Sequence, residues 1–377
     1  MKSIPARVFS LVLVLLVGTS SFLRAQDYGQ FQMLLELNYV SAERTIELYQ
    51  GLGGRPGDIA QLRGSQIALA TTELLAQRRL TNADLEAALE SAKFNQGLGE
   101  DLFRMKEARD NAAALKELYD ELRRRNFGQR VVSTVEQLFP AGVRVSTTLP
   151  IYFVAFGHQN IDAFVRRVVW QGNSPIFVGE GGGELTIVVN LASAIRYGRT
   201  VDERYLGLLS TVAHEVFHAA FGAYKDKSPE WQGHYARSQT YLDALMDLTQ
   251  NEGIAYYLSL IQIARGRLPA DWQQRMTQVF ATYNQCASEL VSPGLTPRRG
   301  NEILRLANTS GYWESYGAMT GMIMARAIDQ YLGRSGLSET IVRGPADFFA
   351  KYAELTRRDP ALPALSPNIL RSLSPWR

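Results

Sequence analysis

The stretch from residue 200 to 222 constrains the fold more than any other part of the chain. Thr200 followed by Glu203 forms a capping-box pattern, which predicts that a helix begins here, and Gly222 is a natural helix end. Apolar residues cover most of the predicted helix surface, and a single narrow strip holds the small and polar residues: Gly207, Ser210, Thr211, His214, Glu215, His218 and Gly222. A helix with this pattern is buried on most of its sides.

The composition of this strip points to a narrow cavity. A strip that faces solvent usually carries Lys, Arg, Glu or Gln, whereas this one holds two of the four histidines in the chain. Residues four apart project from one helix face, so His214 and His218 can bind the same ion, and Glu215 can reach a water molecule on it. The pattern therefore predicts a zinc site. The alternative is an ordinary buried helix, because HExxH also arises by chance in proteins that bind no zinc.

A catalytic zinc ion usually has three protein ligands, so a third one has to be found. The metzincin spacing is excluded, because Tyr224 stands where that class has its third histidine. We favour Glu252, whose predicted helix neighbours include no cation, since a carboxylate on such a face needs a partner. A surface glutamate is the alternative for this residue. Three weaker candidates lie between: His234, Asp243 and Asp247.

The periodicity of the chain predicts an α+β protein that is predominantly helical. Residues 31 to about 139 follow a helical period, and the chain is mostly helical again from 200 to about 355. Between these regions, VRVSTTLPIYFVAFG and SPIFVGEGGGELTIVVN are typical of strands, which predicts a small sheet. GEGGGE, residues 179 to 184, is expected to be a hairpin loop, because a strand follows it and no Gly-Lys-Ser/Thr does.

The first 25 residues have the order of a secretory signal peptide: basic residues, an apolar run and then small residues. A membrane anchor is the alternative, but the run is shorter than the roughly 20 residues that span a bilayer. We expect an exported bacterial protein, periplasmic or secreted, without a stable membrane anchor after cleavage. The expected division is a signal peptide at 1–25, a helical N-terminal region at 26–140, a catalytic-type domain at 141–357 and a Pro-rich tail at 358–377.

Charge and cysteine content limit the partners. Removing residues 1–25 would take three of the 40 basic residues and leave 37, which equals the number of acidic residues. This balance gives no argument for a nucleic-acid partner. Cys286 is the only cysteine, so no internal disulfide can form, and its surroundings predict a buried thiol inside a helix.

HEVFH at 214–218 followed by NEGIA at 251–255 resembles the gluzincin metallopeptidases. Within that clan the chain is most similar to the zinc-dependent peptidases of secreted bacterial proteins. The resemblance implies a gluzincin-like catalytic domain with an active-site helix and a peptide or protein substrate. It also implies one Zn²⁺ per chain, bound by His214, His218 and Glu252, with Glu215 as the general base.

Three further expectations come from the resemblance. ELTIVVN, residues 184–190, occupies the place of the edge strand that pairs with an extended peptide in gluzincins. SYGAMTGMIMARAIDQYLG is similar to a later helix that begins near a tyrosine that stabilises the transition state. Tyr316 is the first choice for that tyrosine, Tyr312 the second, and His234 an outside candidate. No Gly-x-Met-Glu-Asn segment precedes the motif helix, so recognition of a substrate amino terminus does not carry over.

The expected function is a secreted zinc-dependent peptidase. Glu215 would take a proton from a zinc-activated water and later deliver it to the leaving amine. The alternative is a non-catalytic, peptidase-like binding protein that uses the helical N-terminal region to engage a partner. The intact Glu215 argues against this alternative.

Overall fold

The computed structural model describes residues 31–95, 100–159, 162–179, 182–238, 240–264, 267–309 and 313–373. The signal-peptide prediction and Tyr312 therefore lie outside the described residues. The predicted class is confirmed, because most of the described chain is helical and one mixed sheet accompanies the helices. Among the described helices, none combines the length and the apolar character that a membrane crossing requires.

The sheet has five strands in the order β1-β2-β5-β3-β4. Their bounds are β1 Phe31–Asn38, β2 Val145–Val154, β3 Ala163–Gln171, β4 Ser174–Val178 and β5 Glu184–Asn190. β2 is parallel to both β1 and β5, whereas β3 is antiparallel to β5 and to β4. The two segments predicted as strands are confirmed.

The helical prediction was wrong at residues 31–38, which form strand β1. Exposure alternates along this segment, so its apolar residues at every second position face the core and its polar residues face solvent. β1 pairs with β2, which lies more than a hundred residues later in the chain. The N-terminal region therefore contributes a strand to the same sheet as the residues that follow 141.

Two expectations, one about β5 and one about the segment before it, were also wrong. β5 pairs with β2 on one side and with β3 on the other, so ELTIVVN is a central strand and not an edge. The hairpin expected at 179–184 does not form, because β4 and β5 lie on opposite sides of β3 and are not paired with each other; residues 180 and 181 of this segment lie outside the described residues. The tight hairpin lies instead between Gln171 and Ser174, which are paired residues of β3 and β4.

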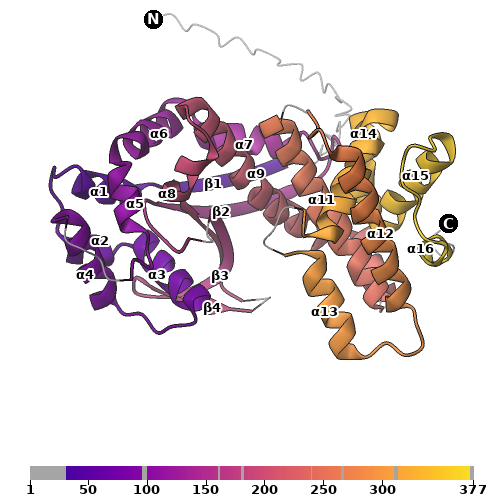
Figure 1. The fold of residues 1–377 in the computed structure, drawn as a ribbon, viewed down its shortest axis with the longest axis horizontal. Coiled ribbons are helices and arrows are strands. Elements are labelled where there is room, and N and C mark those ends of the chain that lie inside the picture. The colour runs from indigo at the N-terminus through magenta and orange to yellow at the C-terminus, as the bar shows by residue number, and fades with distance from the viewer. Residues whose placement is uncertain are drawn as a thin grey trace, which may run out of the picture.

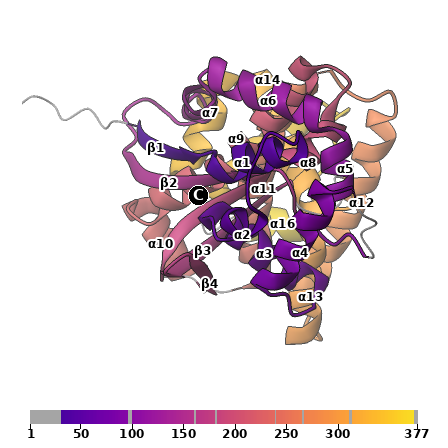
Figure 2. The same cartoon turned by 90° about the vertical axis from the view of Figure 1, so that its left-hand side faces the viewer.

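The first helices cover the two faces of the sheet (Figure 2). Their bounds are α1 Val40–Tyr49, α2 Pro56–Ala60, α3 Arg63–Ala76, α4 Asn82–Lys93, α5 Met105–Asp110, α6 Ala112–Arg124 and α7 Phe127–Glu136. Leu149, Ile151 and Phe153 of β2 belong to the core shared with α6 and α7, whereas Tyr152 and Val154 belong to a second core with α2, α3 and α4. The alternation of side chains along β2 therefore separates the two cores.

The later helices form the other half of the molecule (Figure 1). The chain continues from β5 through α8 Leu191–Ala194 and a 3-10 turn, Ile195–Tyr197, into α9 Val201–Lys225. The remaining helices are α10 Pro229–Arg237, α11 Tyr241–Ala264, α12 Trp272–Leu290, α13 Pro297–Ala307, α14 Tyr316–Arg343, α15 Pro345–Arg358 and α16 Pro367–Ser372. α9 contacts both halves, because it packs against β2, α6 and α7 on one side and α11 on the other.

The predicted start of α9 is confirmed. The Thr200 hydroxyl accepts from the backbone N–H of Glu203, and the Glu203 carboxylate accepts from the backbone N–H of Thr200. The predicted end was wrong, because the helix passes through Gly222 to Lys225. Gly222 has ordinary helical geometry, so its lack of a side chain does not stop the helix there.

The described part of the Pro-rich tail, residues 358–373, is packed against the helical half. Asn284 of α12 donates to the Ala364 carbonyl and accepts from the Ser366 backbone N–H. Leu365, Ile369 and Leu373 are buried. Cys286 lies inside α12 as predicted and is partly buried.

Candidate metal centre

His214, His218 and Glu252 come together where α9 packs against α11. The two histidines lie one turn apart on α9, and Glu252 lies near the middle of α11. The His214 Nε2 and His218 Nε2 atoms are 3.0 Å apart, and Glu252 Oε2 lies 3.6 Å from the first and 3.4 Å from the second. The three side chains are 14%, 20% and 15% exposed. The residues that the sequence singled out thus form one compact, partly buried cluster.

The donor set and spacing of this cluster fit a zinc ion. In a tetrahedral site with metal–ligand bonds of 2.0 to 2.1 Å, neighbouring ligand atoms are about 3.3 to 3.4 Å apart. The three separations in the cluster, 3.0, 3.4 and 3.6 Å, bracket that value. Two imidazole nitrogens and one carboxylate oxygen are also ligands that zinc takes, and three of them leave one position open.

The charges of His218 and Glu252 shift the pKa of each other in the cluster. Burial lowers the pKa of His218, but the Glu252 carboxylate outweighs this effect and raises that pKa to about 9. Burial disfavours the charged form of Glu252, yet His218 and His214 hold its pKa well below the usual range. A buried carboxylate is costly without a positive partner. In this cluster the two imidazoles supply that partner when no metal ion does.

Asn251 and Tyr256 support the two histidines from α11. The Asn251 Oδ1 atom lies 3.2 Å from His218 Nδ1, so it can accept the proton of that nitrogen and leave Nε2 free to face the cluster. The Tyr256 ring packs edge-on against the His214 imidazole, with the ring centroids 4.8 Å apart. Sequence reasoning missed both residues. Their positions, one before and four after Glu252 on the same helix, were the available signal.

Glu215 opens onto a cavity of about 610 Å³ next to the cluster. The described residues that line it come from the start of β3 and from α9 and α11, with neighbouring loop residues: Gln159, Asp162, Ala163, Arg196, Ser210, Thr211, His214, Glu215, Tyr256, Ser259 and Ile263. Four of these belong to the polar strip of α9. The prediction that this strip lines a cavity is therefore confirmed for residues 210 to 215.

The chain matches the model of a known protein family. Residues 58–361 match the family model described as "Putative zinc dependent peptidase (DUF5700)". The chain belongs to the DUF5700 family. No curated protein and no solved structure gives a significant match. The matched range of this DUF5700 protein includes the whole His214, His218 and Glu252 cluster together with Glu215.

The small residues of the α9 strip have separate packing roles in this DUF5700 chain. A Cβ atom on Gly207 would lie 2.7 Å from the Cβ of Tyr197. The absence of a side chain at Gly207 therefore allows Tyr197 to pack against α9. The Thr211 hydroxyl then donates to the Tyr197 hydroxyl at 3.3 Å. Ser210 is 1% exposed, and its hydroxyl has no hydrogen-bond partner among the described residues. The strip is therefore partly a packing surface and partly a cavity wall.

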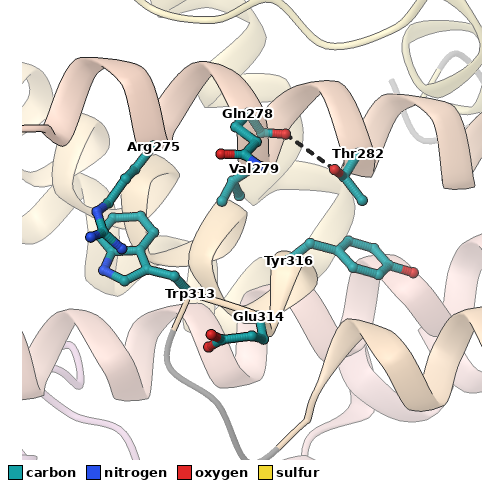
Figure 3. A pocket seen from close by; sticks show the side chains of 7 residues that line it. All are labelled: Arg275, Gln278, Val279, Thr282, Trp313, Glu314 and Tyr316. Atoms are coloured by element: carbon teal, nitrogen blue, oxygen red, sulfur yellow. Dashed lines mark hydrogen bonds between the residues drawn. The ribbon is translucent and has the colours of Figure 1, made fainter.

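Tyr316 does not join the cluster. Its hydroxyl donates to the Ile303 carbonyl of α13 at 2.7 Å, and its side chain is only 6% exposed. It lines a different cavity, of about 380 Å³, together with Trp313 and residues of α12 (Figure 3). Tyr316 therefore points toward α12 and α13. Its place at the start of a predicted helix could not reveal this direction.

The weaker ligand candidates are engaged elsewhere. Asp247 accepts from the buried Lys225 ammonium at 2.6 Å. Asp243 accepts from the Thr240 backbone N–H at the start of α11. His234 is buried beside Trp231, and its Nε2 lies 2.9 Å from the Ser238 hydroxyl. Among the described residues, the cluster able to hold a metal ion consists of His214, His218 and Glu252.

Proposed function

We propose that this DUF5700 protein is a zinc-dependent peptidase of the gluzincin type, exported by its N-terminal segment. The observation that carries the proposal is the combination of a three-ligand cluster with Glu215 beside it in the wall of a cavity. A strictly structural zinc site would have four protein ligands. A three-ligand cluster next to a cavity is the arrangement that leaves room for a substrate.

In this proposal His214, His218 and Glu252 hold the ion, and Glu215 moves the protons. A bound zinc ion would supply Lewis acidity, which makes a water molecule more acidic and polarises a carbonyl group. The Glu215 carboxylate accepts the proton of the attacking water and delivers it to the nitrogen of the leaving amine. Asn251 keeps the His218 ring oriented during both steps. Tyr312 remains the candidate for stabilising the transition state, because the Tyr316 hydroxyl is bound to Ile303.

The edge of β3 supports an extended peptide as substrate. β4 pairs only with residues 167–171 of β3, so no described strand covers the same side of residues 163–166. The Asn190 backbone N–H donates to the Asp162 carbonyl at 3.0 Å. Since bonded and non-bonded pairs alternate along an antiparallel ladder, Ala163 and Val165 direct their backbone groups away from β5. A peptide strand can add at this edge, and Ala163 also lines the cavity that holds Glu215.

Replacing Glu215 by Gln tests the proposal. We expect Glu215→Gln to retain about one zinc per chain by elemental analysis, since Glu215 is not a ligand, and to lose roughly 10²- to 10⁴-fold in peptide hydrolysis. Asp226→Asn, at the exposed end of the same helix, is the matched control and should leave both values unchanged. Full activity in Glu215→Gln would refute the mechanism. Zinc binding without turnover in the unmodified protein would favour the binding-protein alternative.

A further inference from the structure

Arg166 lies where the open edge of β3 ends. It is the last residue of the strand before pairing with β4 begins at Arg167 and Val178. Its guanidinium group lies over the Phe164 ring, 4.0 Å from the centroid, and its Nη1 donates to the Val165 carbonyl at 2.8 Å. That carbonyl is one of the groups directed to the uncovered edge. Arg166 therefore occupies an acceptor that an added peptide strand would use.

The Arg166 guanidinium group is not paired with any carboxylate of the described residues. None of the described carboxylates lies within 4.0 Å of its guanidinium group, and the side chain belongs to an exposed residue. Partial burial lowers the pKa of Arg166, and the Glu215 carboxylate acts in the opposite direction. The guanidinium group is therefore close enough to the candidate catalytic centre for the charge of Glu215 to act on it.

Pairing of a peptide with β3 would release the Nη1 donor of Arg166. The incoming backbone N–H would take over the Val165 carbonyl, and the guanidinium group would lose its hydrogen bond to that atom. A guanidinium group has five N–H donors in a planar fork, and a carboxylate is the acceptor that matches the fork with two parallel bonds. Pairing of a peptide with this edge thus frees the Nη1 donor, so that the guanidinium group can bind a carboxylate of the same peptide with two N–H groups.

We propose that Arg166 determines specificity by binding a carboxylate of the peptide that pairs with the β3 edge. The carboxylate belongs either to an Asp or Glu side chain or to the C-terminus of the peptide. The inference rests on the proposed function in assigning the peptide to this edge, but it concerns recognition, and so it can be measured without turnover. Stacking on Phe164 keeps the side chain near the edge while its donors exchange partners.

Peptide binding to the zinc-loaded Glu215→Gln chain tests Arg166 separately from catalysis. The probe is a fluorescent decapeptide of otherwise uncharged residues in which one Glu is moved through every position, with a matching Gln series. Each peptide is made with a free and with an amidated C-terminus, which distinguishes the two sources of the carboxylate. Dissociation constants are measured by fluorescence anisotropy with Arg166 intact, with Arg166→Gln and with Arg63→Gln. Arg63 is the matched control, because its guanidinium group also stacks on a β3 ring, 4.7 Å from the Trp170 centroid.

We expect the carboxylate-bearing peptide to bind roughly 10- to 100-fold more tightly than its neutral match, as for a charge-assisted hydrogen bond. Arg166→Gln should remove this difference, and Arg63→Gln should keep it. The inference is overturned if no position discriminates Glu from Gln and the free C-terminus gives no advantage. An unchanged preference in Arg166→Gln, an equal loss in Arg63→Gln, or no peptide binding at all would overturn it too. Absence of hydrolysis by the unmodified chain contradicts only the proposed function, since these binding constants do not depend on turnover.

Discussion

At the scale of single residues, the cluster depends on how each imidazole is oriented. Both histidines must present Nε2 to the same point, and an imidazole ring can rotate about its side-chain bonds unless its other nitrogen is held. The Asn251 amide holds Nδ1 of His218 at 3.2 Å. The Tyr256 ring limits the movement of His214 by edge-on packing. Two neighbours that are not ligands therefore decide whether the ligands converge.

Asn251→Ala should weaken zinc binding without removing a ligand. We expect the affinity to fall about 10- to 100-fold, which is the usual cost of losing a partner of a ligating histidine. Competition with a chromogenic chelator measures this change. Asn251→Asp keeps an acceptor oxygen next to Nδ1 and should restore most of the affinity. If Asn251→Ala bound zinc as tightly as the unmodified chain, the orientation of His218 would have to come from other contacts.

At the scale of elements, the position of Glu252 depends on how closely α11 and α14 approach. A Cβ atom on Gly321 of α14 would lie 1.9 Å from the Thr249 carbonyl oxygen and 2.8 Å from the Gly253 Cα. One on Gly253 would lie 2.3 Å from the Gly321 Cα. The two helices thus touch backbone to backbone beside Glu252. This contact is the physical reason for a glycine directly after the glutamate in the NEG segment.

Gly321→Ala should push α11 and α14 apart. We expect a loss of about 1 to 3 kcal/mol in the free energy of unfolding, or more, because the clashing atoms belong to backbone and cannot rotate away. Zinc affinity should fall as well, since the displaced helix carries Glu252. Urea unfolding and chelator competition measure the two effects.

Gly222→Ala is the control for this prediction. Gly222 also lies inside a helix, but an added Cβ would meet no atom within 4 Å. Its replacement should be neutral or stabilise the protein by about 0.5 to 1 kcal/mol. Similar losses for both variants would show that glycine flexibility, and not the close crossing, is what matters at position 321.

At the scale of the whole molecule, the cluster joins α9, which covers the sheet, to α11 of the helical half (Figure 1). Around the motif, the side of α9 that faces away from the cluster is apolar and buried, with Val212, Ala213, Val216 and Phe217 at 0% exposure. Burial of this kind is the main source of folding free energy. The fold should therefore form without metal, and a metal ion would add stability to it.

Removing zinc should lower stability and leave the chain folded. At a free zinc concentration of 100 times the dissociation constant, binding to the folded state alone adds about 2.7 kcal/mol. Thermal unfolding with zinc and with excess chelator, followed by circular dichroism, measures the difference. The zinc-dependent shift should vanish in His218→Ala. A shift of the same size in that variant would place the ion elsewhere, and a fully unfolded chelated protein would contradict the dominance of the apolar core.

Local spacing was sufficient to predict the parts of the site that lie on one helix. Helical geometry relates residues that are close in the sequence. It was therefore enough to interpret the four-residue interval between His214 and His218, the capping box at Thr200 and the apolar residues of α9. Glu252 was also found locally, because a carboxylate on an apolar helix face needs a partner wherever that helix packs. The mostly helical α+β class followed from the same periodicities.

Tertiary structure decided everything that depends on which segments meet. The order of the strands made β5 central and left residues 163–166 of β3 as the open edge, and it drew residues 31–38 into the sheet. Contacts between distant segments also determine the direction of Tyr316, the hydrogen bond between Asn251 and His218, and the close crossing of α11 and α14 at Gly253 and Gly321. Periodicity reports which face of an element is apolar, but several partners can bury that face equally well. Which partner does so depends on the packing of the whole chain, because contacts between distant segments are selected together.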